Sequence, residues 1–258
     1  MADVRWTRMV SVGDSFTEGL HDGEEDALVG WADRLAVHLD CRRDDAAPLE
    51  YANLAIRGRL LGQIIEEQLP RALELGPDLV TLCGGGNDLL RPGSDPDALA
   101  ARLEAAVVDL RSRGVDVLVQ TLVDPRDSPV IRLQRPKYGV FNASVWSIAQ
   151  RHGAHVLDLW GMRSLRDWRM WASDRIHLTP AGHERVAQGA LVALGLTPDT
   201  PEWDDPLVPL PHPPRSEWLR ANARWAREHG LPWVRRRMRG VSSGDGRAPK
   251  RPVPLPVR

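Results

Sequence analysis

Short apolar segments rich in branched residues alternate with longer segments of helical periodicity along most of this chain. The short segments are residues 7–12, 50–54, 79–83, 115–122 and 155–159. Each has the length and composition of a buried strand, and the segments between them place apolar residues on one helical face. Such alternation is typical of βαβ units, whose strands run parallel. We therefore predict an α/β domain built on a parallel sheet of five strands.

The predicted helices cover residues 31–39, 60–75, 95–113, 141–151 and 179–194. Pro70 falls inside the second of these and predicts a kink, because proline removes an intrahelical donor. Asp95 and Thr179, each followed by a proline, are favourable starts for the third and the last helix. Residues 124–139 show no periodic pattern, so we expect a long loop there.

A change of composition near residue 197 divides the chain into three parts. Residues 1–197 form the predicted α/β domain. Residues 198–214 contain seven prolines and predict an extended connector that runs over the surface. In residues 215–258 we expect an arginine-rich helix that is capped by Ser216 and ends at Gly230, with disorder from Ser242 onward.

The net charge of −1 conceals two regions of opposite charge. Residues 215–258 carry 12 arginines and lysines against 3 acidic residues, so the rest of the chain is acidic. A basic tail can bind nucleic acid or an anionic membrane, or it can dock on the acidic body while its arginines stay solvated. We favour docking. The residues concerned are Trp218, Trp225, Trp233, Arg235, Arg236, Arg237 and Arg239.

Composition excludes several other classes of protein. The two cysteines, Cys41 and Cys83, are too few for a disulfide framework and lie in no spacing that holds zinc. No apolar run approaches the length of about 18 residues that a membrane span requires, and the N-terminus lacks a basic region followed by an apolar stretch. We therefore expect a cytoplasmic protein without a metal or another cofactor.

Two polar groups far apart in the sequence could act together in nucleophilic catalysis. Gly13-Asp14-Ser15 follows the first strand, where a tight turn can present a serine hydroxyl at the edge of the sheet. Asp174 lies three residues before His177, so its carboxylate can fold back onto the imidazole and orient it as a base. Each pattern alone has an ordinary structural explanation, namely a helix cap for the serine and a surface turn for the other pair.

Two further groups follow the second and third strands and belong to the same edge of a parallel sheet. Gly58 offers a backbone amide, and Asn87, in Gly85-Gly86-Asn87-Asp88, offers a side-chain amide. Together with the amide of Ser15 they could stabilise an oxyanion. Asn87 could instead cap a loop, and Asp14 and Asp88 are expected to hold turns.

These residues resemble the four sequence blocks of the SGNH hydrolases, which are also called GDSL-type esterases and lipases. Gly13 to Gly19 resembles the first block, Asn53 to Gly58 the second, Gly85 to Asp88 the third, and Asp174 to His177 the last. The likeness covers roughly residues 5–195. It implies a three-layer α/β/α sandwich with a flavodoxin-like sheet. The proline-rich and basic helical tail lies outside the resemblance.

The resemblance implies a serine hydrolase that cleaves carboxylic esters through an acyl-enzyme. It makes Ser15 the nucleophile, His177 the base and Asp174 its orienter, with Ser15, Gly58 and Asn87 as oxyanion donors. An O-acyltransferase would use the same site with an alcohol as acceptor. A rival of another class is a non-catalytic module that binds phosphate or nucleic acid, but no phosphate-binding motif supports it.

Several residues near these blocks are expected to be structural. His183 falls inside the last helix and is expected to pack there. Trp160, Trp168 and Trp171 precede Asp174, and we favour core packing over a role in lining a pocket. The expected partner is a small-molecule ester substrate. The sequence does not specify its acyl or alcohol part, nor the oligomeric state of the protein.

Overall fold

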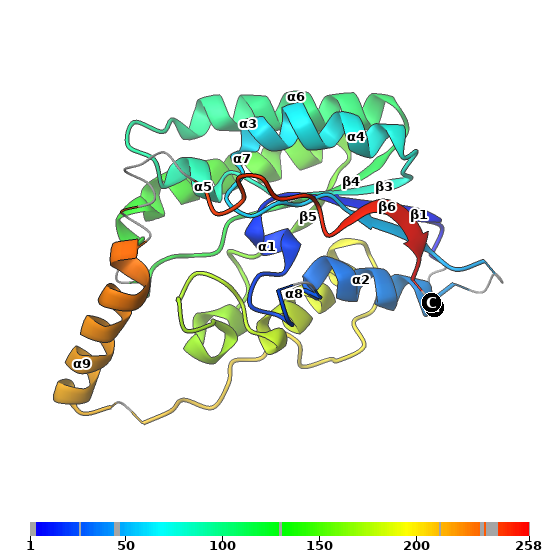
Figure 1. Cartoon of the computed structure of the whole chain (residues 1–258). Coiled ribbons are helices and arrows are strands. Elements are labelled where there is room, and N and C mark those ends of the chain that lie inside the picture. The colour runs from blue at the N-terminus through cyan, green and yellow to red at the C-terminus, as the bar shows by residue number, and fades with distance from the viewer. Residues whose placement is uncertain are drawn as a thin grey trace.

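A six-stranded sheet with the order β5-β4-β3-β1-β2-β6 forms the centre of the protein, shown in Figure 1 as a computed structural model. The structure describes residues 4–25, 27–43, 47–128, 131–211, 213–232, 235 and 242–257. Five strands run parallel to one another, which confirms the predicted sheet. They are β1 (Arg8–Val12), β2 (Glu50–Asn53), β3 (Leu79–Leu82), β4 (Asp116–Gln120) and β5 (His155–Leu157).

Helices cover both faces of this sheet, so that the protein has three layers (Figure 1). One face packs against α3 (Leu61–Gln63), η1 (Ile64–Gln68), α4 (Leu69–Glu74), α6 (Pro96–Ser112) and α7 (Arg135–His152). The other face packs against α2 (Trp31–Asp40) and α8 (Pro180–Ala193). Two strands are each followed by a short helix after a turn of a few residues. These helices are α1 (Ser15–Glu18) after β1 and α5 (Gly86–Leu89) after β3.

Successive residues of a strand belong alternately to the two hydrophobic clusters, one on each face of the sheet. Met9 and Leu79 belong to the cluster that includes α2 and α8, whereas Val10 and Val80 belong to the cluster on the opposite face. This alternation follows from the pleat of a β-strand. Because both faces are covered, the strands place apolar residues on both faces of the sheet.

The observed helices correct two details of the sequence prediction. The expected loop at 124–139 is shorter, because α7 begins at Arg135 and has a proline in its first turn, where proline is well tolerated. The expected helix at 60–75 consists of α3, η1 and α4 in succession. Its π-helical turn, η1, ends at Gln68, directly before the turn that contains Pro70.

The last described segment is ordered, and the prediction of disorder from Ser242 onward is wrong there. Residues Arg251–Pro256 form β6, which pairs antiparallel with β2 at the edge of the sheet. Prolines at every second position leave alternate backbone N–H groups to pair with β2, and an edge strand tolerates them. The guanidinium of Arg251 also donates to the carbonyl of Tyr51 (2.7 Å) and stacks on its ring.

Between α8 and β6 the chain leaves the sheet and returns to it. The connector turns at residues 201–204 and then runs beneath the domain to α9 (Arg215–Trp225), which continues as η5 (Ala226–Gly230) (Figure 1). Ser216 lies in the first turn of α9 and does not cap it, because the cap position is Pro214. Trp233, Arg236, Arg237 and Arg239 lie outside the described residues. No helix in the described part of the chain has the length and apolar character needed to cross a bilayer.

Removal of a central core side chain should destabilise the fold strongly. Leu79 is fully buried in β3, so Leu79→Ala should lower the free energy of unfolding by about 2–5 kcal/mol. Leu133→Ala is the matched control, because that side chain is 81% exposed and its loss should cost less than about 0.5 kcal/mol. Urea unfolding followed by tryptophan fluorescence measures both; equal effects would contradict the placement of Leu79.

His183 should make stability depend on pH. It is buried on α8, where its Nδ1 accepts the backbone N–H of Trp31 (3.2 Å), and burial lowers its pKa from 6.5 to about 3. The unfolded chain takes up this proton below pH 6.5 but the folded chain does not. Stability is therefore fully present above pH 6.5 and should fall by up to about 1.4 kcal/mol per pH unit towards pH 3.

The variant His183→Asn tests this assignment, because the asparagine oxygen can still accept the N–H of Trp31 while it cannot titrate. We expect its unfolding free energy to fall less steeply than that of the wild type between pH 6.5 and pH 4. Parallel slopes for the two proteins in urea titrations would show that His183 does not titrate as described.

Candidate active site

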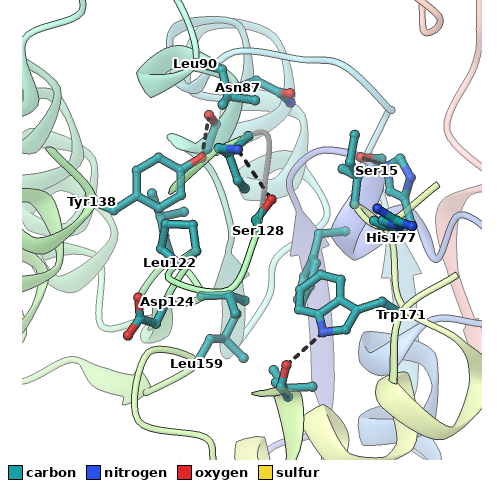
Figure 2. Close-up of a pocket in the computed structure, with 18 of the residues that line it drawn as sticks. Ser15, Asn87, Leu90, Leu122, Asp124, Ser128, Tyr138, Leu159, Trp171 and His177 are labelled. Atoms are coloured by element: carbon teal, nitrogen blue, oxygen red, sulfur yellow. Dashed lines mark hydrogen bonds between the residues drawn. The ribbon is translucent and has the colours of Figure 1, made fainter. Parts of the chain in front are cut away.

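Ser15, His177 and Asp174 form one hydrogen-bonded line, as the sequence predicted. The Nε2 atom of His177 lies 2.8 Å from the Ser15 Oγ, and its Nδ1 atom lies 2.6 Å from Asp174 Oδ2. Ser15 is the first residue of α1, directly beyond β1, whereas the other two residues lie in the turn that precedes α8. Figure 2 shows Ser15 and His177 together at one side of a pocket. The β1–α1 turn and the turn before α8 thus meet at one edge of the sheet.

The turn at Asp174 holds its carboxylate in place and keeps it charged. Asp174 Oδ1 accepts the backbone N–H groups of Ile176 and His177, both at 3.0 Å. Burial alone would raise the pKa of Asp174, but the hydrogen bond and charge of His177 outweigh it and hold this pKa well below the usual range. A charged carboxylate at this position fixes the imidazole with its Nε2 towards the serine.

A buried glutamine braces the turn that presents Ser15. The side-chain amide of Gln68, at the end of η1, accepts the N–H of Gly13 (2.8 Å) and donates to its carbonyl (3.0 Å). A Cβ atom at Gly13 would lie 2.8 Å from Thr17 Oγ1 and 3.0 Å from the carbonyl oxygen of Cys83. Glycine is therefore required here by close packing, and Gln68 is a site residue that sequence patterns did not single out.

Asn87 lies beside the Ser15 turn, on α5. Its Nδ2 donates to Asp14 Oδ2 and to the carbonyl of Arg59, both at 3.1 Å. Asp14 in turn accepts the N–H of Phe16 (3.0 Å) and so caps α1, and burial raises its pKa to about 6. Asp88 accepts the N–H of Leu61 (2.9 Å), so both aspartates hold turns, as expected.

Gly58 is placed differently from the other predicted oxyanion donors. It has a left-handed backbone (φ 75°), which favours glycine, but it is not among the described residues that line the pocket. A Cβ atom there would clash with the Oγ of Ser242, in the segment that leads to β6. The preceding Arg57 forms a buried ion pair with Glu18 (2.7 Å), which ties this loop to α1. The role of Gly58 stays a prediction.

His21 is a neighbour of the hydrogen-bonded line that nothing in its sequence spacing indicated. Its Nε2 lies 3.0 Å from Asp174 Oδ2, and its ring centre is 5.4 Å from that of His177. It has a left-handed backbone (φ 72°), which is uncommon for a residue with a side chain. Among the described residues, these three form a group whose potential metal-ligand atoms all lie within 4.8 Å of one another. A metal ion there would compete with the bond between Asp174 and His177.

The pocket beside Ser15 has a volume of about 390 Å³ and is walled largely by apolar side chains. In Figure 2, Leu122 and Tyr138 lie across the pocket from Ser15 and His177, and Trp171 lies below Ser15 and His177 in this view. Trp168 and Trp171 both line the pocket. The expectation of core packing is wrong for Trp168, which is 42% exposed, whereas Trp171 and Trp160 each pack against a core cluster. The indole of Trp171 is fixed by a hydrogen bond to the carbonyl of Leu165 (2.8 Å).

Solved structures similar to this chain share its fold. LAE5, an alpha/beta hydrolase from the metagenome of Lake Arreo in Spain, is 24% identical with a TM-score of 0.59, over 73% of this chain and 95% of that one. The esterase EstA from Pseudoalteromonas sp. is 18% identical with a TM-score of 0.58, over 73% and 97% of the two chains. The acetylxylan esterase Axe2 from Geobacillus stearothermophilus is 19% identical with a TM-score of 0.58, over 74% and 94%.

The family of the chain follows from its sequence. No curated protein matches it. Residues 11–185, however, match the model of the GDSL-like lipase/acylhydrolase family, and this range contains Ser15, Asn87, Asp174 and His177. The match spans well over half of the chain. The protein therefore belongs to the GDSL-like lipase/acylhydrolase family, the esterase-like hydrolases also known as SGNH hydrolases.

Proposed function

We propose that this protein hydrolyses carboxylic esters through an acyl-enzyme formed on Ser15. The observation that carries the proposal is the continuous line from the Ser15 hydroxyl through the His177 imidazole to the Asp174 carboxylate, open to a pocket. A serine hydroxyl is a weak nucleophile by itself and needs an adjacent base that is held by a third group. The described site supplies both.

The proposed reaction begins from hydrogen bonds that Ser15, His177 and Asp174 already form. Ser15 Oγ attacks the carbonyl carbon of the ester while its proton passes to His177 Nε2. The tetrahedral intermediate then collapses, and the leaving alcohol takes that proton from His177. Water attacks the acyl-enzyme with His177 again as the base, the acid is released and the serine regains its proton. Asp174 stabilises the imidazolium in both halves.

The oxyanion needs hydrogen-bond donors near Ser15. The N–H of Ser15 lies at the start of α1, where backbone donors have no intrahelical acceptor. We assign Asn87 Nδ2 as the second donor, since it lines the same pocket. Gly58 N–H is the third proposed donor, and only the sequence resemblance supports it. The two acceptors of Asn87 in the free protein are Asp14 and a carbonyl oxygen, and a developing oxyanion competes well with the carbonyl.

Loss of the Ser15 hydroxyl should abolish turnover. We expect Ser15→Ala to release no measurable p-nitrophenol from p-nitrophenyl acetate above the buffer rate, because the hydroxyl that forms the acyl-enzyme is lost. Ser147→Ala is the matched control, because this serine lies exposed on α7 and donates only to a backbone carbonyl within that helix. Turnover by Ser15→Ala at the wild-type rate would rule out the proposed nucleophile.

Loss of the Asn87 amide should reduce the stabilisation of the transition state more than it reduces substrate binding. We expect Asn87→Ala to lower kcat by about 10²- to 10³-fold with little change in KM, as removal of one oxyanion donor does elsewhere. Initial rates over a range of ester concentrations separate the two constants. A raised KM with an unchanged kcat would place Asn87 in substrate binding instead.

A further inference from the structure

We infer that the C-terminal helical segment, α9 with η5, builds a wall of the ester site and selects esters that carry a hydrocarbon chain. The inference rests on the proposed function and adds a substrate class to it. The segment spans Arg215 to Gly230, which lies beyond the residues matched by the family model. Its contacts, not its sequence, connect it to the site.

Two hydrogen bonds join α9 to the turn that carries Asp174 and His177. The indole Nε1 of Trp225 donates to the backbone carbonyl of Asp174 (2.9 Å), and the guanidinium of Arg175 donates to Asn222 Oδ1 (2.6 Å). Trp225 and Asn222 are about one turn apart on the helix and so reach the same strip of the protein. The helix is thereby placed against the turn that carries His177.

Aromatic contacts strengthen this attachment. The guanidinium carbon of Arg175 lies 5.9 Å from the ring centre of Trp168 and 5.5 Å from that of Trp225, within the range of cation–π attraction. Arg175 has a left-handed backbone (φ 59°), which is costly for a residue with a side chain. The contacts of Arg175 with α9 help to offset that cost.

The same helical segment lines the pocket opposite the body of the domain. Trp225 and Leu231, the residue directly after η5, contribute to its lining together with Leu122, Leu159 and Trp171. An acetyl group would leave much of this apolar wall in contact with water, whereas a longer chain would bury it. Because each buried methylene contributes about 0.8 kcal/mol, which is about a fourfold change, selectivity should grow with chain length.

The test compares kcat/KM for p-nitrophenyl octanoate with that for p-nitrophenyl acetate. We expect the wild-type ratio to be about 60, as burial of roughly half of the six additional methylenes would give. Trp225→Ala should lower this ratio about tenfold. Because the ratio compares two esters on the same variant, a general loss of activity that follows from the lost bond to Asp174 does not change it. Octyl acetate, compared with ethyl acetate, shows whether the chain that is selected belongs to the acyl or to the alcohol part.

The helix itself supplies the control. Trp218→Ala removes an indole of the same helix that is 54% exposed and does not line the pocket, so its ratio should equal that of the wild type. Trp225→Phe keeps an apolar ring but loses the bond to the carbonyl of Asp174, and should largely keep the ratio. If Trp225→Ala fails to fold, Leu231→Glu, at a half-exposed position of the wall, should lower the ratio in its place.

The possible failures are distinguishable. An equal fall of the ratio in Trp218→Ala and Trp225→Ala would overturn the assignment of this segment as a wall of the site. A ratio that falls neither in Trp225→Ala nor in Leu231→Glu would overturn it as well. Wild-type enzyme that hydrolyses acetate and octanoate equally, and ethyl and octyl acetate equally, would overturn the substrate class while leaving the esterase proposal intact. A wild-type protein that hydrolyses none of these esters would count against the proposed function itself.

Discussion

The imidazole of His177 bridges a hydroxyl and a carboxylate, and the proposed chemistry depends on that bridge. Ser15 and His177 are 162 residues apart in sequence, so the fold has to bring them within 2.8 Å. The bond between His177 and Asp174 is local and is made within one turn of chain. The long-range part of the site is therefore the placement of that turn beside the end of β1, and most of the surrounding structure contributes to it.

Buried and partly buried polar contacts stabilise this placement from several sides. Gln68 brackets Gly13, Asn87 contacts Asp14, and Asp88 holds the start of α3, so neighbouring turns at the carboxyl edge of the sheet are bonded to one another. Buried polar groups of this kind are costly when left unpaired, which makes a single arrangement strongly preferred. Trp225 adds a contact from outside the common domain, because it holds the carbonyl of Asp174.

The core of this arrangement was predictable because the signals are local. Strand periodicity indicated the parallel sheet, and the sheet required Ser15 and Asn87 to share one edge. Other features depend on tertiary contacts that periodicity does not record. The strand β6 is rich in proline and forms only because β2 offers a free edge, and His21 reaches Asp174 through an unusual backbone conformation. The docking of α9 was favoured from charge and tryptophan content, but its contact with the Asp174 turn was not foreseeable.

A crystal structure of the protein after reaction with a phosphonate ester tests the central claim most directly, because the tetrahedral phosphorus imitates the intermediate. The account predicts phosphorus bonded to Ser15 Oγ, one phosphoryl oxygen within hydrogen-bond distance of the Ser15 N–H and Asn87 Nδ2, and His177 still bound to Asp174. Phosphorus on another residue, or on Ser15 with that oxygen pointing away from both donors, would contradict it.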